Sequence, residues 1–203
     1  MLNKDWTGNS NSIWKTLGAS NHTDKERQNE DFYATQPLAA ELLLQIEDID
    51  KKKAIWECAA GQKHLSNVFE KYGYKVRSSD IVVRTEGVEQ LDFLSQNEKW
   101  DGTIITNPPY NQAVKFVEKA IKTVSDGNKV IMFLKVQFLE GKTRKKLFEK
   151  YPPKTVWVSS SRIMCAKNGN FEEMVAGGGS AVAYAFYVWE KGYKGNTTLK
   201  WFN

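Results

Sequence analysis

Short apolar runs alternate with amphipathic segments along this sequence, and this alternation limits its fold more than any other feature. The run Val130–Leu134 is unbroken, as expected of a strand that is buried on both faces of a sheet. A segment with helical spacing precedes it (Ala113–Val124), and a basic segment follows it (about Leu139–Lys150). This order predicts a three-layer α/β sandwich around a mainly parallel sheet.

The same pattern continues on both sides of this region. Strands are expected over the apolar runs Ala54–Trp56, Tyr74–Arg77, Thr103–Ile105, Val130–Leu134, Val156–Val158 and Val182–Trp189. Further helices are expected from Pro37 to about Ile46 and after Gly61 to about Tyr72. Ligands of such sheets bind beyond the carboxyl ends of the strands, so polar residues there are the first candidates for a site.

Two stretches lack this pattern. The first thirty residues are polar and carry no sustained hydrophobic period. We therefore expect an irregular arm over residues 1–30 and a single domain over residues 31–203, which are enough to form a full core. Residues Ser159–Ser180 are too long and too Gly-rich for a plain connector, and such loops are usually functional or disordered.

Composition argues against several classes of protein. No apolar run approaches the roughly 18 residues that cross a membrane, and the polar start of the chain lacks the apolar core of a signal peptide. The two cysteines, Cys58 and Cys165, imply no disulfide framework. The two histidines, His22 and His64, have no zinc-ligand spacing with them. These features predict a cytoplasmic protein without a membrane segment or a bound metal.

The most specific motif is Asn107-Pro108-Pro109-Tyr110, directly after a predicted strand. An exocyclic amino group on a heterocycle is a poor nucleophile because its lone pair is delocalised into the ring. Two acceptors that bind both amino hydrogens can favour attack, and the Asn107 side chain and the rigidly held Pro108 carbonyl can supply them. Tyr110 offers an aromatic face for a planar target. By itself the motif could be a turn, but its place at the ligand edge favours catalysis.

This motif resembles the catalytic loop of S-adenosylmethionine-dependent amino-methyltransferases, which reads (Asp/Asn/Ser)-Pro-Pro-(Tyr/Phe/Trp). Four other segments resemble the remaining motifs in the order that gamma-type adenine methyltransferases use: Asp31–Pro37, Glu57–Leu65, Ser78–Asp80 and Leu91–Leu94. Residues Val182–Lys191 resemble the closing antiparallel strand of that family. The resemblance covers about residues 31–191. The residues of these motifs are similar to those of small methyltransferases of bacteriophages and prophages.

The resemblance implies a Rossmann-like methyltransferase fold, with a seven-stranded sheet whose last strand is antiparallel, and S-adenosyl-L-methionine as cofactor. It implies that the cofactor is held by Tyr33, Thr35, Glu57, Ala59, Gly61, Asp80, Asp92 and Phe93. The residues themselves agree in part. Asp80 lies 19 residues beyond Gly61, a spacing at which an acid can bind both ribose hydroxyls. Asp92 can accept a hydrogen bond from the amino group of the cofactor, with Phe93 lining the ring.

The cofactor loop departs from the family pattern in two places. Lys63 stands where a second glycine is usual, and it would be tolerated if its side chain points outward. Cys58 stands where proline is common, and it is expected to be a small buried residue rather than a nucleophile, because this chemistry has no covalent step. His64 is expected to be structural.

The positive charge of the chain is concentrated in one segment. Residues 135–167 contain nine Lys or Arg and two Glu, a net charge of +7, whereas the whole chain carries +5. This pattern suits phosphate binding, although a charge run is more often a solvated helix face. We expect a DNA partner, with RNA left open, held through Lys142, Arg144, Lys145, Lys146, Arg162 and Lys167. Asn168 and Asn170 would approach the target base with Arg162.

The combined prediction is an enzyme that methylates the exocyclic amino group of adenine in DNA. Three alternatives remain open at this point: an RNA base amino group, a protein glutamine, or a catalytically silent cofactor-binding or DNA-binding regulator. The choice between adenine and cytosine also stays open. No separate target-recognition domain is expected, so recognition would come from the N-terminal arm, from Ser159–Ser180 or from a partner subunit, and a homodimer is one option.

Overall fold

The structure is a computed structural model that describes residues 33–176 and 182–203, without the side chain of Lys167. The predicted arm over residues 1–30 and the predicted domain start at residue 31 lie outside the described residues, so both stay predictions. The described part contains an eight-stranded sheet in the order β10-β7-β9-β6-β5-β2-β3-β4 and a separate two-stranded sheet formed by β1 and β8.

The elements follow the predicted alternation, with most boundaries within a few residues. The strands are β1 (Tyr33–Thr35), β2 (Ala54–Glu57), β3 (Val76–Asp80), β4 (Glu89–Gln90), β5 (Gly102–Thr106), β6 (Lys129–Lys135), β7 (Thr155–Ser159), β8 (Cys165–Lys167), β9 (Tyr184–Glu190) and β10 (Thr198–Phe202). The helices are α3 (Leu38–Ile46), α4 (His64–Lys71), α5 (Ala113–Thr123), α6 (Lys142–Lys150) and α7 (Phe171–Ala176), with short 3₁₀ turns η1 (Tyr110–Gln112) and η2 (Val136–Leu139).

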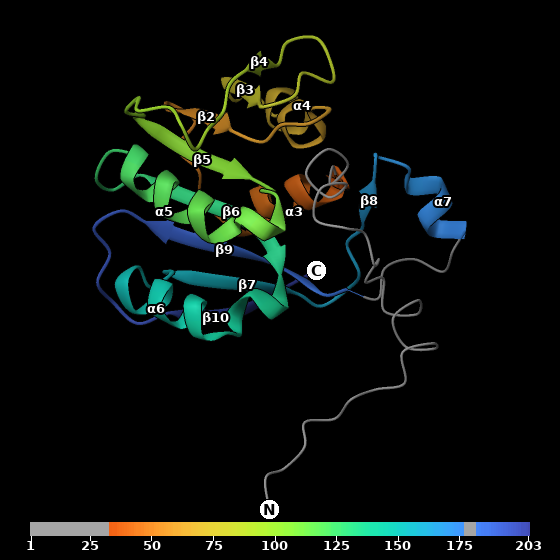
Figure 1. Ribbon diagram of the computed structural model, residues 1–203. Helices are drawn as coiled ribbons and strands as arrows, with labels where there is room; N and C mark the ends of the chain where they lie inside the picture. The colour runs from red at the N-terminus through yellow and green to blue at the C-terminus, as the bar shows by residue number, and fades with distance from the viewer. Residues whose placement is uncertain (1–32, 177–181) are drawn as a thin grey trace, which may run out of the picture. The chain divides into compact units, whose positions relative to one another are not determined.

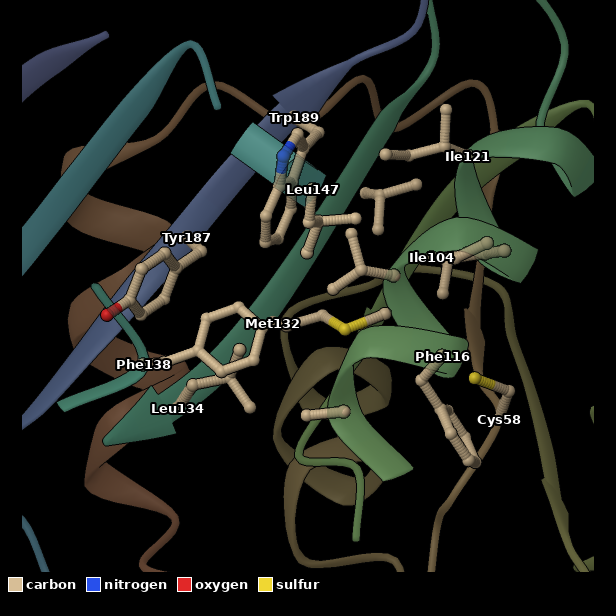
Figure 2. Close-up of a cluster of buried hydrophobic side chains, with 14 of the residues drawn as sticks. Cys58, Ile104, Phe116, Ile121, Met132, Leu134, Phe138, Leu147, Tyr187 and Trp189 are labelled. Carbon is tan, nitrogen blue, oxygen red and sulfur yellow. The ribbon is translucent and has the colours of Figure 1, made fainter. Parts of the chain in front are cut away.

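The predicted three-layer architecture is confirmed. One hydrophobic cluster joins the sheet to α5 and α6, and a second joins its other face to α3 and α4. Figure 1 shows these two pairs of helices on opposite faces of the sheet. The unbroken run in β6 contributes to both clusters, because Met132 and Leu134 face the first and Ile131 and Phe133 face the second. Figure 2 shows Met132 and Leu134 in the first cluster.

The strand order places a switch point between β2 and β5. From β2 the chain continues outward through β3 and β4, then returns to β5 on the other side of β2 and continues outward to β6. These neighbours are all parallel. In such sheets the connections leaving two adjacent strands diverge at this point, which leaves a crevice at their carboxyl ends. The segments that follow β2 and β5 therefore occupy the position expected for a binding site.

The sheet differs from the prediction at its end. The predicted antiparallel strand is present as β9, which pairs antiparallel with both β6 and β7. It is not the last strand, because β10 follows it and pairs parallel with β7, so the described sheet has eight strands rather than seven. Only Phe202 of β10 is buried, against Phe186, and a strand with one buried side chain carries little hydrophobic signal in the sequence.

A second difference concerns the segment that was predicted to be irregular between β7 and β9. It contains β8, which pairs antiparallel with β1, and the short helix α7. Residues 177–181, which include the three successive glycines, lie outside the described residues.

Candidate functional site

Asn107 follows β5 directly, at the switch point of the sheet. Its side-chain nitrogen, Nδ2, donates a hydrogen bond to the backbone carbonyl of Tyr33 over 3.1 Å. A carbonyl can only accept, so the amide must turn its nitrogen toward Tyr33 and its oxygen away. That oxygen, Oδ1, is buried and has no hydrogen-bond partner among the described residues. Buried polar atoms are rarely left unpaired, so this acceptor is a marker of a ligand position.

The carbonyl of Tyr33 is placed by the pairing of β1 with β8. In this pair Tyr33 lies opposite Lys167 and Thr35 lies opposite Cys165. The pair continues at Gln36, whose backbone amide donates to the carbonyl of Met164 over 3.0 Å. The two segments are far apart in the sequence, and each strand has only three residues. Sequence reasoning missed this pairing, because such short strands give no periodic signal.

Tyr110 begins the turn η1 after the two prolines, and aromatic rings lie on more than one side of it. Its ring centroid is 6.5 Å from that of Tyr33 and 6.3 Å from that of Tyr184. The ammonium group of Lys135 lies 4.9 Å from the centre of the Tyr110 ring, in cation–π geometry. A planar target that stacks on this ring would therefore meet Lys135, a residue that sequence reasoning did not select.

Glu57 ends β2, and its carboxyl group is directed into the protein. The residue is 3% exposed, and its Oε2 accepts hydrogen bonds from both the backbone amide and the hydroxyl of Ser66 in α4. The Ser66 hydroxyl also pairs with that of Ser78 in β3 over 2.7 Å. Burial raises the pKa of Glu57 from its ordinary 4.5 to about 8, partly offset by the hydrogen bonds from Ser66. Glu57 therefore ties β2, α4 and β3 together beneath the loop.

Gly61 and Asp80 are brought together, as their spacing predicts. The backbone amide of Gly61 donates to Oδ2 of Asp80 over 2.8 Å, and Oδ1 accepts from the amide of Val82 over 3.0 Å. Gly61 has a φ of +53°, a conformation that glycine adopts without strain. Asp80 is only 7% exposed, so its carboxylate is fixed at the carboxyl end of β3, beside the loop that follows β2.

Lys63 has a left-handed backbone conformation, with a φ of +64°. This conformation explains why glycine would suit the position, since a residue with a Cβ is strained there by about 1–2 kcal/mol. The side chain runs to α4, where Nζ forms an ion pair with Glu70 over 3.1 Å. The lysine thus replaces glycine with its side chain held on the helix.

The two cofactor candidates in the segment after β4, Asp92 and Phe93, differ in their exposure to solvent. Asp92 is exposed, and its Oδ1 accepts a hydrogen bond from the Leu94 amide over 2.9 Å, which stabilises the local turn. Phe93 is 2% exposed and packs 5.3 Å from the rings of both Trp56 and Phe116. Its side chain packs in the core, and its expected place beside a bound ring stays a prediction. The sequence shows an apolar residue but not which side of the loop it faces.

The two remaining cofactor candidates, Ala59 and Thr35, lie on different segments. Ala59 is half-buried in the loop after β2. Thr35 is buried in β1, with its hydroxyl 3.9 Å from the thiol of Cys165. Cys58 is also buried, as predicted.

The basic candidates separate into two groups. Lys142, Lys145 and Lys146 are exposed on α6, while Arg144 is half-buried with its guanidinium 5.6 Å from the ring of Phe138. Arg162 is exposed in the segment after β7. Lys167 lies in β8, but its side chain is outside the described part of the structure.

The segment around α7 packs on the loop that follows β2. A Cβ added to Gly169 would lie 2.8 Å from the side chain of Gln62, and the ring of Phe171 is 5.6 Å from that of His64. Asn170 uses its side chain to cap α7, since its Oδ1 accepts from the Glu173 amide over 3.2 Å. Asn168 has a φ of +53° in the preceding turn. These asparagines therefore shape the segment itself, and their expected approach to a target base stays a prediction.

No grouping of three or more His, Cys, Asp or Glu side chains that could hold a metal ion occurs in residues 33–176 and 182–203. Over the same residues, every helix is too short or too polar to span a bilayer.

The sequence matches no protein-family profile and no curated protein. Solved structures do match. One from Listeria monocytogenes, described provisionally as a class I S-adenosylmethionine-dependent methyltransferase, has a TM-score of 0.55 at 13% identity and covers 81% of this chain. The M protein of the type I restriction enzyme EcoKI has a TM-score of 0.55 at 14% identity, again over 81% of this chain.

A third match is an S-adenosylmethionine-dependent O-methyltransferase from Thermotoga maritima, with a TM-score of 0.53 at 13% identity over 80% of this chain and 69% of its own. The alignments span 62% of the Listeria structure and 45% of the EcoKI protein. At these identities the likeness bears on fold alone. The chain therefore has the Rossmann-like α/β fold of class I methyltransferase structures.

The buried carboxyl of Glu57 generates a testable prediction about stability. The folded state holds this proton up to a pKa of about 8, whereas the unfolded chain releases it near 4.5. The wild-type protein therefore loses stability from this group as pH rises from about 5 to 8, with a slope approaching the one-proton limit of roughly 1.4 kcal/mol per pH unit. Glu57→Gln removes this dependence, so the variant should gain stability relative to the wild type over that range.

Urea unfolding at several pH values measures this difference. Glu86→Gln, the same change at an exposed position, is the matched control and should track the wild type. A constant difference between Glu57→Gln and the wild type from pH 5 to 8 would show that Glu57 is ionised in the folded protein.

Proposed function

We propose that this protein transfers a methyl group from S-adenosyl-L-methionine to the exocyclic amino group of adenine in DNA. The observation that carries the proposal is the buried Oδ1 of Asn107 at the switch point of the sheet, which has no hydrogen-bond partner in residues 33–176 and 182–203. A protein gains nothing in stability from such an atom, because leaving an acceptor unpaired costs about 1–3 kcal/mol. An amino group placed against it would recover that energy.

The Asn107 side chain has a neighbour suited to share the task. The carbonyl of Pro108 accepts no backbone hydrogen bond from the rest of the described chain, and Pro109 after it limits its motion. Two acceptors, one on the side chain and one on the backbone, can bind the two hydrogens of one amino group. They favour the pyramidal nitrogen and the positive charge that develops on it during attack. The hydrogen bond to Tyr33 keeps the Asn107 oxygen in place for this role.

Residues at the carboxyl ends of the neighbouring strands are suited to bind the cofactor. Gly61 and the buried carboxylate of Asp80 would hold its ribose, and the Asp92 carboxylate, exposed on the next segment, would be available to its amino group. When bound, the cofactor supplies a methyl group on a positively charged sulfur. The Asn107 and Pro108 oxygens would hold the amino nitrogen for attack on that methyl group, with the sulfur as the leaving group. The proton then left on nitrogen would be acidic and pass to water, so the site would need no general base.

Two observations support DNA as the substrate. Helix α6 exposes Lys142, Lys145 and Lys146, and a base within a duplex must be extruded by a protein that grips the flanking phosphates. One of the similar structures is part of a restriction enzyme, EcoKI. An RNA base or a protein glutamine would use the same two acceptors, which is why the substrate needs a direct test.

Asn107 gives the first test of this proposal. Asn107→Ala should lower kcat on DNA by roughly 10²–10³, the loss typical of one transition-state hydrogen bond, while cofactor affinity stays nearly unchanged. Asn107→Asp is more specific. Its carboxylate would face the Tyr33 carbonyl and repel it, whereas the protonated acid can donate there and still offer an oxygen to the amine. The activity of this variant should therefore rise as pH falls, unlike that of the wild type.

Steady-state kinetics with radiolabelled cofactor between pH 5 and 8 measure both effects, and calorimetry measures cofactor binding. Full activity of Asn107→Ala at every pH would rule out polarisation of the amine by this residue.

The basic helix gives a second test. Lys145→Glu combined with Lys146→Glu should weaken DNA binding for every sequence and reduce the slope of log K against log salt by about 0.9 for each phosphate that the helix no longer neutralises. The matched control is Lys51→Glu combined with Lys52→Glu. This exposed pair lies just before β2, at the amino end of that strand.

Fluorescence anisotropy with a labelled duplex at several salt concentrations measures the slope. If both double variants keep the wild-type slope, α6 is a solvated helix face and the RNA or protein alternatives gain support.

A further inference from the structure

A cavity of about 250 Å³ lies beside Tyr110, on the side of the sheet that carries α5 and α6. It is bounded by the carboxyl end of β6, the turn η2 and the start of α6. Asn107 and the residues proposed for cofactor binding do not line it. The cavity is therefore next to the proposed catalytic position, with Tyr110 as the shared wall.

The lining of this cavity combines apolar and aromatic side chains with polar ones. Ala113 and Leu134, each 1% exposed, line it together with the rings of Tyr110 and Phe138. Figure 2 shows Leu134 and Phe138 near each other in the core cluster that borders the cavity. Such a surface favours a flat, largely apolar group that can lie against the rings.

The rim carries four polar side chains: Lys135, Gln137, Glu140 and Arg144. The side-chain amide of Gln137 and the carboxylate of Glu140 are exposed, and neither has a hydrogen bond or ion pair within the described chain. The cations are held in place differently. Lys135 lies over the Tyr110 ring, and Arg144 donates from Nε to the Glu140 carbonyl while its guanidinium lies near Phe138.

The combination of aromatic rings in the lining and polar side chains at the rim restricts the chemical class of ligand that the cavity can bind. A free phosphate would meet the Glu140 carboxylate at the rim, and it would leave the apolar and aromatic side chains of the lining without a contact. A plain hydrocarbon would leave the Gln137 amide and the Glu140 carboxylate without a partner. A nucleobase fits both parts, since its faces can lie against aromatic rings and its edge carries donors and acceptors.

The Gln137 amide and the Glu140 carboxylate indicate which edge of the base would be recognised. A glutamine amide pairs with the amino group and ring nitrogen of adenine, and a carboxylate accepts from the amino group of cytosine. Both therefore favour adenine or cytosine, whose amino groups lie on the major-groove edge. Guanine carries its amino group on the minor-groove edge, and thymine has none to donate to the Glu140 carboxylate.

We propose that this cavity binds the nucleobase next to the one that is methylated, and that Gln137 and Glu140 select adenine or cytosine at that position. The inference rests on the proposed function, because that function identifies the base that is methylated. The binding of a base in the cavity does not itself depend on it. It gives the protein a means of selecting its sites that lies within the catalytic domain.

The test uses DNA duplexes in which one target adenine is flanked on either side by each of the four bases. The wild type should methylate duplexes with adenine or cytosine at one flanking position faster, in kcat/KM, than those with thymine there. Gln137→Leu should reduce this preference by about tenfold, the discrimination that one bidentate contact provides, with no change in cofactor affinity. Glu140→Gln, which keeps the shape of the side chain, should alter the preference without abolishing methylation. Gln45→Leu, an exposed change on α3, is the control.

The outcomes separate the two claims. If DNA is methylated and Gln137→Leu keeps the wild-type preference, the pocket proposal is overturned and the proposed function stands. A variant that changes the methylated base rather than its neighbour also overturns it, because the pocket would then hold the target. If no duplex is methylated, binding of adenosine and cytidine decides: affinity that falls about tenfold in Gln137→Leu supports a base pocket in a protein of another function, and no binding overturns it.

Discussion

The hydrogen bond between the Asn107 amide and the Tyr33 carbonyl determines what the candidate site can do. It joins residues 74 positions apart and fixes which atom of the amide faces the ligand edge. Without it, the side chain could present either its donor or its acceptor. With it, the site presents an oxygen, which suits a partner with N–H groups and not one that can only accept.

This interaction depends on segments from three parts of the chain. β5 ends at the residue before Asn107, β1 carries Tyr33, and β8 holds β1 in place through an antiparallel pair. The loop after β2 is supported separately, by Glu57 with Ser66 and by Asp80 with Gly61. The α7 segment packs on that loop, so the segment between β7 and β9 contacts both the loop and β1. If the proposed function holds, changes in this segment should affect cofactor binding and catalysis together.

Local pattern was enough to predict most of the sheet and the strand ends at which Asn107 and Asp80 lie. Val130–Leu134 is a buried strand, and both Asn107 and Asp80 lie at the ends of strands, because an apolar run followed by polar or turn residues has a direct structural meaning. The pairing of β1 with β8 could not be predicted in this way. It is a contact between two short segments, and its formation depends on tertiary packing.

Individual side chains show the same limit. Phe93 and Asp92 are adjacent, yet one is in the core and the other at the surface, and composition does not reveal that division. Glu57 has the sequence position of a ligand residue, but its carboxyl points to the Ser66 amide. Lys135 ends β6 and Gln137 lies just after it, and neither belongs to a motif. The structure identifies them, because Lys135 lies over the Tyr110 ring and both residues line the cavity.

The most direct measurement of the central claim is the identity of the methylated nucleoside. Duplex DNA, structured RNA and a denatured protein mixture would each be incubated with the protein and isotopically labelled S-adenosyl-L-methionine, digested, and analysed by mass spectrometry. The account predicts label on the exocyclic amino group of deoxyadenosine from DNA, and its loss in Asn107→Ala. Label on a ring carbon or on an oxygen, or equal labelling by the wild type and Asn107→Ala, would contradict the role given to the Asn107 oxygen.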